Sequence, residues 1–469
     1  MLSNFLKERI EIAKSIVDEL SKEYEYVSIF GKHAKGKRIV LNSKVTSIGE
    51  SASLMETEAG FVIKVFNDSH YSEYSLDDIK DFDKDSFKQA IILEDLKQDY
   101  VKVDVIKDEK INKSFTRVDE YPLDEGEILE RLAKFKTYFE NYDKRIVNVF
   151  CGVINREVSS IFVSKNKVLD QYYVWNNVLT SLLSVDERGM KDLFKSTNDV
   201  SVKVALDQME AKLEEIAKLS IQLLDATPIE AGVYDVICDP TISGLIAHEA
   251  FGHGVEMDMF VKNRAKAKDY INKQVASELV GMKDGAASAL SAASYFFDDD
   301  GILAQDTTII KNGILCNGIS DILTASVLNK EPSGNSRRES TRRKAYTRMT
   351  NTFFTAGKDK VEDMFKSIKH GYYLCDTNNG MEDPKNWQIQ CTAQYGLEIK
   401  DGEFTGKIVS PVVISGYVPD VLKSISMVSD EVVITGAGMC GKGHKEWVHV
   451  SDGGPYLKAK VKLGWLIHY

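Results

Sequence analysis

The stretch CDPTISGLIAHEAFGHGVEMD, residues 238–258, carries the pattern on which the interpretation of this sequence depends. Asp239 is a natural helix N-cap, and Pro240 suits the first helical position. We therefore expect a helix to begin here and to turn its apolar residues inward. That helix would deliver His248 and Glu249 near its far end.

Two histidines in this stretch stand five residues apart, in the pattern H-E-x-x-x-H. The familiar zinc helix uses H-E-x-x-H, because histidines at i and i+4 share one face. On an ideal α-helix His248 and His253 would lie about 140° apart, too wide for one ion. The backbone must widen locally, as a π-type turn or an unwound end allows, and Gly252 makes such a distortion easier. The pattern predicts a zinc site, with Glu249 as the carboxylate that takes a proton from activated water.

A catalytic zinc site usually has three protein ligands and one open position, so a third donor is needed. One candidate is Cys440, which lies among four glycines in EVVITGAGMCGKGHKEWVHVSDGGP, residues 431–455. His444 and His449 in the same stretch compete for that position. GAGMCG also satisfies G-x-G-x-x-G, but no helical apolar period follows it, which excludes a dinucleotide fold. The residues alone leave the third ligand open.

Length and charge set the broad class of the protein. A chain of 469 residues is long enough to form two domains. Its hydrophobic fraction of 43% is typical of globular proteins with large cores. The formal net charge of -11 disfavours nucleic-acid binding, except at one basic segment, residues 334–344. We interpret this segment as a solvated loop. Its basic residues are Arg337, Arg338, Arg342, Arg343 and Lys344.

The compartment is predicted from what the sequence lacks. The amino terminus has no continuous apolar region of the signal-peptide type, and no window approaches the roughly 20 apolar residues of a membrane span. Six cysteines show no paired spacing, which favours free thiols in a reducing compartment. We expect a cytoplasmic protein that contacts no membrane.

Helical and strand periodicities predict an α+β fold. Apolar residues recur at helical spacing over about residues 2–23, 127–142 and 202–224. Runs rich in β-branched and aromatic residues, 145–164 and 168–185, predict β-hairpins.

We place a domain boundary after residue 226. Residues 1–226 are expected to form an amino-terminal domain of helices and antiparallel strands. Residues 227–469 are expected to form a β-rich domain that carries the metal helix. Its short strands are punctuated by glycine and asparagine, as in antiparallel sheets that bend or close.

Four further residues are candidates for supporting roles. Glu256 and Asp258 follow the metal segment and could orient a ligating imidazole. A solvent-exposed acidic turn would show the same sequence pattern. Arg348 and Asn351 lie on a strand-like run that could bind an extended peptide substrate by strand addition. Polar packing against the sheet is the simpler account of that pair.

Several blocks of this sequence, in this order, resemble the TldD/PmbA family, the zinc peptidases historically named modulators of DNA gyrase. The first block is the H-E-x-x-x-H segment itself, and the others follow it along the second half of the chain. They are HEAFGHGVEMD at 248–258, FDDDGILAQDTTIIKNGIL at 297–315, SRRES at 336–340, RMTNT at 348–352, GAGMCGKG at 436–443 and VSDGGP at 450–455.

The resemblance implies a zinc peptidase with a barrel-like carboxy-terminal domain, one zinc ion per chain and a TldD-type catalytic role. It implies His248, His253 and Cys440 as ligands and Glu249 as the base. Implied substrates are unfolded or flexible peptides in an enclosed site. Implied partners are a second copy of the chain or a PmbA/TldE-like paralogue. Met257, His444 and His449 depart from the family pattern.

Two other functions remain as alternatives. The chain could be a non-catalytic regulator that binds a topoisomerase or a toxin–antitoxin pair, although binding alone needs no open zinc position. It could also be a zinc hydrolase that acts on non-peptide amides.

Overall fold

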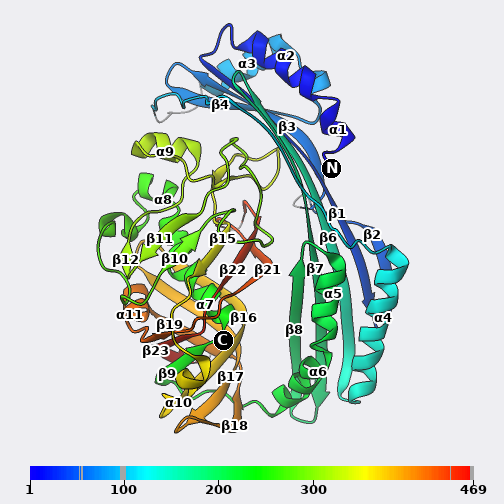
Figure 1. The fold of residues 1–469 in the computed structure, drawn as a ribbon, viewed down its shortest axis with the longest axis vertical. Coiled ribbons are helices and arrows are strands. Elements are labelled where there is room, and N and C mark those ends of the chain that lie inside the picture. Colours follow the sequence, from blue (N-terminus) through cyan, green and yellow to red (C-terminus); the bar gives the residue numbers. More distant parts are fainter. Residues whose placement is uncertain (52, 54–55, 96–101, 444, 465–469) are drawn as a thin grey trace.

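The computed structural model describes residues 1–51, 53, 56–95, 102–443 and 445–464 (Figure 1). An amino-terminal half is built on one long, curved sheet, and a carboxy-terminal half of three smaller sheets lies against its concave side (Figure 1). Within those ranges, no helix is both long and apolar enough to cross a membrane.

The amino-terminal sheet has eight strands, in the order β4-β3-β1-β6-β7-β5, with β2 on β1 and β8 on β7. β6 and β7 pair along almost their whole length, so each predicted hairpin segment is one long strand of a single hairpin. All pairings are antiparallel except that of β5 with β7. The strands are β1 (Tyr26–Asn42), β2 (Thr46–Glu50), β3 (Glu58–Asn67), β4 (His70–Leu76), β5 (Ile111–Arg117), β6 (Ile146–Ser164), β7 (Lys167–Asp186) and β8 (Gly189–Asp199).

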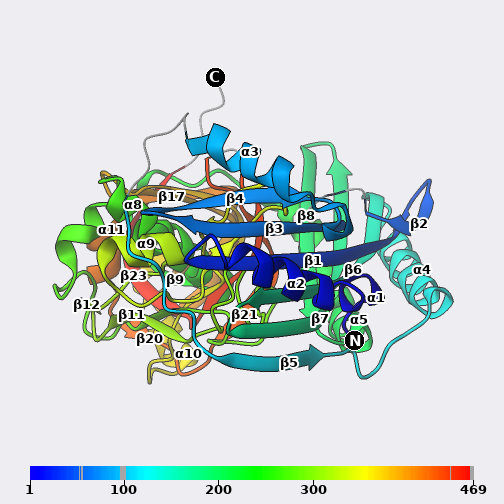
Figure 2. The ribbon, with the colours of Figure 1, turned by 90° about the horizontal axis from the view of Figure 1, so that it is seen from above.

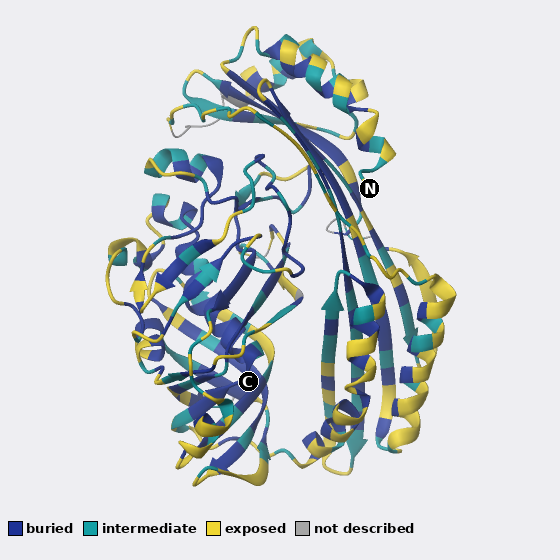
Figure 3. Cartoon of the chain, viewed as in Figure 1, coloured by how far each residue is buried: buried dark blue, intermediate teal, exposed yellow. Residues whose placement is uncertain are grey.

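Two groups of helices cover this sheet. The first group packs over β1 and β4 (Figure 2), and the second packs on β6, β7 and β8 with one face buried and the other exposed (Figure 3). The first comprises α1 (Asn4–Lys7), α2 (Ile10–Leu20) and α3 (Lys84–Asp95), with the short turn η1 (Ile79–Asp81). The second comprises α4 (Glu125–Tyr142), α5 (Val202–Glu210) and α6 (Leu213–Gln222), followed by η2 (Leu223–Asp225).

The predicted helix over 127–142 is confirmed as α4, which begins with a capping box between Asp124 and Glu127. The other two predicted helices are each broken into two. The first is interrupted at Arg9. This residue is buried, and its guanidinium group donates a hydrogen bond to the carboxylate of Asp78. The second breaks at Ala211, between α5 and α6.

The carboxy-terminal half contains a five-stranded barrel, which confirms the barrel-like expectation. β16, β9, β23, β19 and β17 follow one another, and β17 pairs back with β16 to close the ring. β18 extends the sheet at β17, and β20 extends it at β23. These strands are β9 (Gly232–Cys238), β16 (His370–Asp383), β17 (Gln388–Lys400), β18 (Glu403–Val409), β19 (Val412–Tyr417), β20 (Met427–Val428) and β23 (Leu457–Gly464).

A six-stranded sheet, in the order β12-β11-β10-β15-β22-β21, accompanies the barrel. β13 and β14 form a separate two-stranded pair. The strands are β10 (Met282–Asp284), β11 (Thr307–Lys311), β12 (Ile314–Leu315), β13 (Ser336–Arg337), β14 (Tyr346–Thr347), β15 (Asn351–Phe354), β21 (Val433–Cys440) and β22 (Val448–Gly454). The short helices are α8 (Asp258–Val261), η5 (Lys266–Tyr270), α9 (Ile322–Leu328), α10 (Val361–Lys366) and α11 (Val418–Lys423).

Helix α7 (Pro240–Ile246) contacts both the barrel and the six-stranded sheet and belongs to the largest hydrophobic core. It approaches the backbone of β22 closely, because Gly244 has no side chain. A Cβ on Gly244 would stand 2.6 Å from the Cα of Gly453, which is backbone and cannot move aside easily. This contact fixes the distance between α7 and β22, and β22 in turn pairs with β21.

The basic segment 334–344 joins the two halves, so its interpretation as a solvated loop was wrong in part. Arg338 is 5% exposed and donates two hydrogen bonds, of 2.6 and 2.8 Å, to the carboxylate of Glu73 in β4. Arg342 is exposed as predicted, and it too reaches a carboxylate of the amino-terminal half, that of Asp77. Three basic residues of the segment thus pair with carboxylates, Arg338 with Glu73, Arg342 with Asp77 and Arg343 with Glu446. The predicted boundary after residue 226 lies between η2 and β9 and stays a prediction.

We predict that Gly244→Ala will destabilise the carboxy-terminal half. An added Cβ must push α7 away from β22, and overpacking of this kind costs about 1–3 kcal/mol of unfolding free energy. Denaturant unfolding, followed by tryptophan fluorescence, would measure the loss. Gly49→Ala is the matched control, because a Cβ on Gly49 meets nothing within 4 Å. Equal stability of the two variants would contradict the close approach.

Candidate metal centre

The metal segment begins as an ordinary helix and then widens. Asp239 caps α7, with its Oδ1 accepting a 2.8 Å hydrogen bond from the backbone N–H of Ile242, and Pro240 stands in the first turn as predicted. A π-helical turn, Ala247–Gly252, follows directly and leads into a 3-10 turn, His253–Val255. The local widening inferred from the five-residue spacing is therefore confirmed.

Gly252 serves this turn differently from what the sequence suggested. Its backbone, with φ of -58° and ψ of -58°, is ordinary helical backbone that any residue adopts. The absence of a side chain matters because the Sδ of buried Met349 occupies the space where a Cβ would stand. The glycine therefore permits close packing against the segment that follows β14, and it does not supply an unusual backbone angle.

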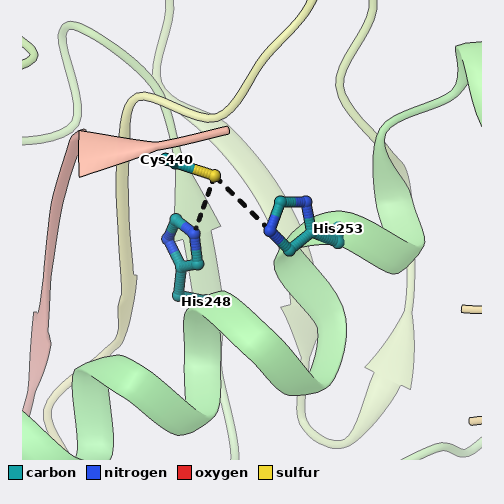
Figure 4. A group of neighbouring side chains, drawn as sticks. All are labelled: His248, His253 and Cys440. Atoms are coloured by element: carbon teal, nitrogen blue, oxygen red, sulfur yellow. Dashed lines mark hydrogen bonds between the residues drawn. The ribbon is translucent and has the colours of Figure 1, made fainter. Parts of the chain in front are cut away.

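His248, His253 and Cys440 converge on one point (Figure 4). The Sγ of Cys440 lies 3.3 Å from Nε2 of His248 and 3.4 Å from Nε2 of His253, and the three donor atoms all lie within 4.8 Å of one another. With ordinary zinc bond lengths and tetrahedral angles, a sulfur and a nitrogen ligand lie about 3.6 Å apart. The donor set and its spacing therefore fit a zinc ion.

His248 and Cys440 are buried, His253 is partly exposed, and the three side chains are strongly coupled electrostatically. Burial alone would lower the pKa of His248, but the neighbouring Cys440 thiolate raises that pKa to about 9. Burial likewise opposes ionisation of Cys440, yet the two imidazoles hold the pKa of its thiol well below the usual value. The site therefore favours a thiolate, which is the form that binds metal.

Arg348 also contacts the sulfur of Cys440. Its side chain is 0% exposed, and its Nη2 donates 3.0 Å hydrogen bonds to both Sγ and the carbonyl oxygen of Cys440. Nη1 donates to the carbonyl of Glu446, and Nε donates at 3.2 Å to the carboxylate of Glu256. All three guanidinium nitrogens are thus occupied by the protein.

Glu256 contacts the candidate ligand His253, whereas Asp258 approaches the site through Lys442. Oε2 of Glu256 lies 3.4 Å from Nδ1 of His253, and both carboxylates bind the Nζ of Lys442, at 2.8 and 2.9 Å. Burial disfavours the charged form of Glu256, but Lys442, His253 and Arg348 hold its pKa well below the ordinary value. In contrast, Nδ1 of His248 is buried with no hydrogen-bond partner among the residues that the structure describes.

The remaining candidates lie elsewhere. Asn351 is 0% exposed and donates to the carbonyls of Gly285 and Ala289 at 3.1 Å, so it ties a loop to β15. His449 faces Met439 across β21 and β22 and is not part of the group of three donors. His444 lies outside the described residues.

Sequence reasoning missed two residues of the site. Lys442 stands two positions after Cys440, and its proximity in sequence could have signalled it. Glu382 comes from β16, far away in the chain, and its Oε1 lies 2.9 Å from where a Cβ on Gly254 would stand. Burial raises the pKa of Glu382 well above its ordinary value, against the opposing effect of His253. No local pattern marks this residue.

The comparisons with known proteins agree with this geometry. Residues 231–462 match the family model described as the PmbA/TldA metallopeptidase C-terminal domain. A metalloprotease of Methanothermobacter thermautotrophicus is 28% identical over 320 residues, which cover 67% of this chain and 69% of that protein. A zinc metalloprotease TldD homolog of Saccharolobus solfataricus is 32% identical over 261 residues, or 55% of this chain and 57% of that protein. Apart from the first of these, the chain matches little more than half the length of most of the curated relatives.

Solved structures show the same mixed α+β fold over nearly the whole chain. A protein described as a modulator of a DNA gyrase from Thermotoga maritima has a TM-score of 0.76 at 18% identity, covering 97% of this chain and 100% of that one. TldE from Thermococcus kodakarensis has a TM-score of 0.71 at 17% identity, covering 96% and 99%. Through its carboxy-terminal domain, the chain belongs to the PmbA/TldD metallopeptidase family.

Proposed function

We propose that the protein is a zinc-dependent peptidase that hydrolyses unfolded or flexible peptides, with one zinc ion per chain. The observation that carries this proposal is the convergence of the donors of His248, His253 and Cys440 within 4.8 Å. Three donors leave one position of a tetrahedral zinc ion open, as catalytic sites require. The curated relative described as a zinc metalloprotease supports the choice of metal.

Glu249 is the residue that moves protons in this proposal. A bound zinc ion supplies Lewis-acid polarisation of the scissile carbonyl and a water molecule of lowered pKa. Glu249 follows His248 in the π-helical turn, and its Cδ lies 3.1 Å from the Cβ position of Gly380 in β16. From there its carboxylate accepts the proton of the attacking water and delivers it to the leaving amine.

The peptide would enter as an extended strand. β21 is the last strand in the order of the six-stranded sheet, and it ends at Cys440. A peptide that pairs with this strand would run next to the proposed metal ligands. Its backbone would form the hydrogen bonds, so binding would depend little on the peptide's sequence. This arrangement supports a preference for unfolded over folded substrates.

Arg348 receives a different role from the one predicted. Substrate contact by Arg348 or Asn351 has no support in the geometry, because both side chains are 0% exposed. We assign to Arg348 the positioning of Cys440, and to Glu256 the orientation of His253. Lys442 and Asp258 complete the ion-pair network that keeps both residues in place.

The proposal places the protein in the cytoplasm as part of a dimer. None of the six cysteines, all of which are described, forms a disulfide, which agrees with a reducing compartment. The structural match to TldE supports a partner that is either a second copy or a paralogue of this type. A non-catalytic regulator and a hydrolase of non-peptide amides remain the competing functions.

Glu249→Gln should lower the rate of peptide hydrolysis by about 100-fold or more, because general bases contribute factors of this size. Zinc content should stay at one ion per chain. The assay would use an unfolded casein-type protein and short peptides, with and without chelator, alongside metal analysis. Glu331→Gln, at an exposed position in the same half, should keep wild-type activity.

Full activity of Glu249→Gln would overturn the assignment of the base. Wild-type protein that is loaded with zinc but cleaves only non-peptide amides would favour the second competing function. Protein with no hydrolytic activity of either kind would favour a regulator.

Cys440→Ser should reduce bound zinc from about one ion per chain to a small fraction, because a thiolate ligand is lost. Elemental analysis after dialysis against a weak chelator would measure it. Cys316→Ser is the matched control, since Cys316 is free and exposed. Unchanged stoichiometry in Cys440→Ser would transfer the ligand role to His449 or His444.

Arg348→Met should weaken zinc binding by about 10- to 100-fold, the usual effect of losing a partner that orients a ligand. Competition with a chromogenic chelator would give the dissociation constant, and circular dichroism of the metal-free protein would establish that the variant folds. Arg342→Met, which removes an exposed arginine, should leave zinc affinity unchanged. A folded Arg348→Met variant with wild-type affinity would contradict the positioning role.

A further inference from the structure

Glu382 brings an additional carboxylate to the metal centre from a different element. It lies near the end of β16, opposite Ile389 of β17, and the face of β16 that carries it also carries Gly380. Gly380 packs against Glu249, and Oε1 of Glu382 approaches Gly254, the residue after His253. The end of this barrel strand therefore runs alongside both the proposed base and one proposed ligand.

The carboxyl group of Glu382 has no ion-pair partner among the described residues, and the nearby His253 opposes but does not overcome the effect of burial on its pKa. Both of its oxygens are buried, and neither has a hydrogen-bond partner among the described residues. Burial raises the pKa of Glu382 well above its ordinary value, and a positive partner placed beside its two oxygens would favour the charged form. The cations of the site do not supply it, because Arg348 and Lys442 are engaged by Glu256 and Asp258.

The metal ion does not supply the counter-charge directly either. The group of donors that can share one ion consists of His248, His253 and Cys440, and Glu382 lies outside it. A positive group on a molecule that enters the site would supply this missing partner. In a peptidase, the molecule that enters is the peptide.

We propose that Glu382 is a specificity-determining residue that binds an ammonium group of the peptide substrate next to the scissile bond. This inference rests on the proposed peptidase function. The ammonium group can be the free amino terminus or the side chain of a lysine, and both have the same chemistry towards a carboxylate.

The position of Glu382 suits this role. In a substrate cleaved after its first residue, only the Cα separates the amino nitrogen from the scissile carbonyl carbon, a distance of about 2.5 Å. Its receptor must therefore border the metal ligands, as Glu382 does at Gly254. Glu382 is partly exposed although its oxygens are turned inward, and its neighbour Met381 is 66% exposed. Rotation of the side chain brings the carboxylate to an entering substrate.

The test compares matched peptides on zinc-loaded wild-type protein and Glu382→Gln. One pair differs in a free or acetylated amino terminus. The other pair is acetylated and differs in lysine or norleucine at the position before the scissile bond. Wild-type protein should prefer at least one charged member by roughly 10-fold or more in kcat/KM, the range of a hydrogen bond to a charged group. Glu382→Gln should reduce that preference to within about 2-fold, since glutamine keeps the shape and removes the charge.

Glu398→Gln is the matched control. Glu398 is a buried carboxylate of the same barrel, in β17, but it is already paired with His370 and Lys400. This variant should keep the wild-type preference. The proposal would be overturned if wild-type protein and Glu382→Gln preferred the charged peptides to the same extent. It would also be overturned if wild-type protein cleaved the charged and uncharged members of both peptide pairs equally well. The pair of peptides that responds identifies the source of the ammonium group.

A binding experiment separates this inference from the peptidase function on which it rests. Fluorescence anisotropy of the same peptides, labelled at the carboxy terminus, would measure their affinity without turnover in zinc-loaded Glu249→Gln, with and without the Glu382→Gln substitution. A charge preference in binding that Glu382→Gln abolishes would support the role of Glu382 even if no peptide were cleaved. Cleavage without any charge preference would refute Glu382 and leave the peptidase function intact.

Discussion

The convergence of two imidazoles, five residues apart, with a thiolate from another strand is the constraint on which the rest of the structure depends. A regular helix would point the histidines about 140° apart, so the π-helical turn at Ala247–Gly252 is a requirement of the site. The sulfur of Cys440 then has to lie at a fixed distance from that turn. The close contact between α7 and β22 at Gly244 sets this distance, because β22 pairs with β21 and Cys440 lies opposite Val448 in that pairing.

Charge balance explains how the site tolerates so many buried ionic groups. Arg348 and Lys442 bring two positive charges, and Glu256 and Asp258 bring two negative charges, all within one connected set of ion pairs. This set is neutral without the metal, so it can form before zinc binds. In a medium of low dielectric constant such compensation is worth far more than at the surface. The thiolate of Cys440 adds a negative charge that a bound zinc ion would neutralise.

The sequence predicted what local geometry determines and missed what distant packing determines. Helical periodicity located α4, β-branched runs located β6 and β7, and the histidine spacing alone required a widened turn. The role of Gly252 could not be found, because it depends on Met349, almost a hundred residues away. The strand-like run containing Arg348 was recognised, but its side-chain direction depends on which face the sheet buries. Glu382 and the ring closure of β16 with β17 depend on pairing that no short pattern encodes. The choice of Cys440 came from a family resemblance rather than from spacing.

The amino-terminal half reaches the metal centre through a short series of contacts. Arg338 is anchored on Glu73 of β4, and the same basic segment continues to Arg343, which pairs with the carboxylate of Glu446. The carbonyl of Glu446 accepts a hydrogen bond from Arg348, which in turn holds Cys440. Because Glu446 is bound at both its side chain and its carbonyl, a displacement of the basic segment has to move either Arg348 or the loop after Cys440. The long curved sheet therefore helps to set the position of Cys440, the proposed metal ligand.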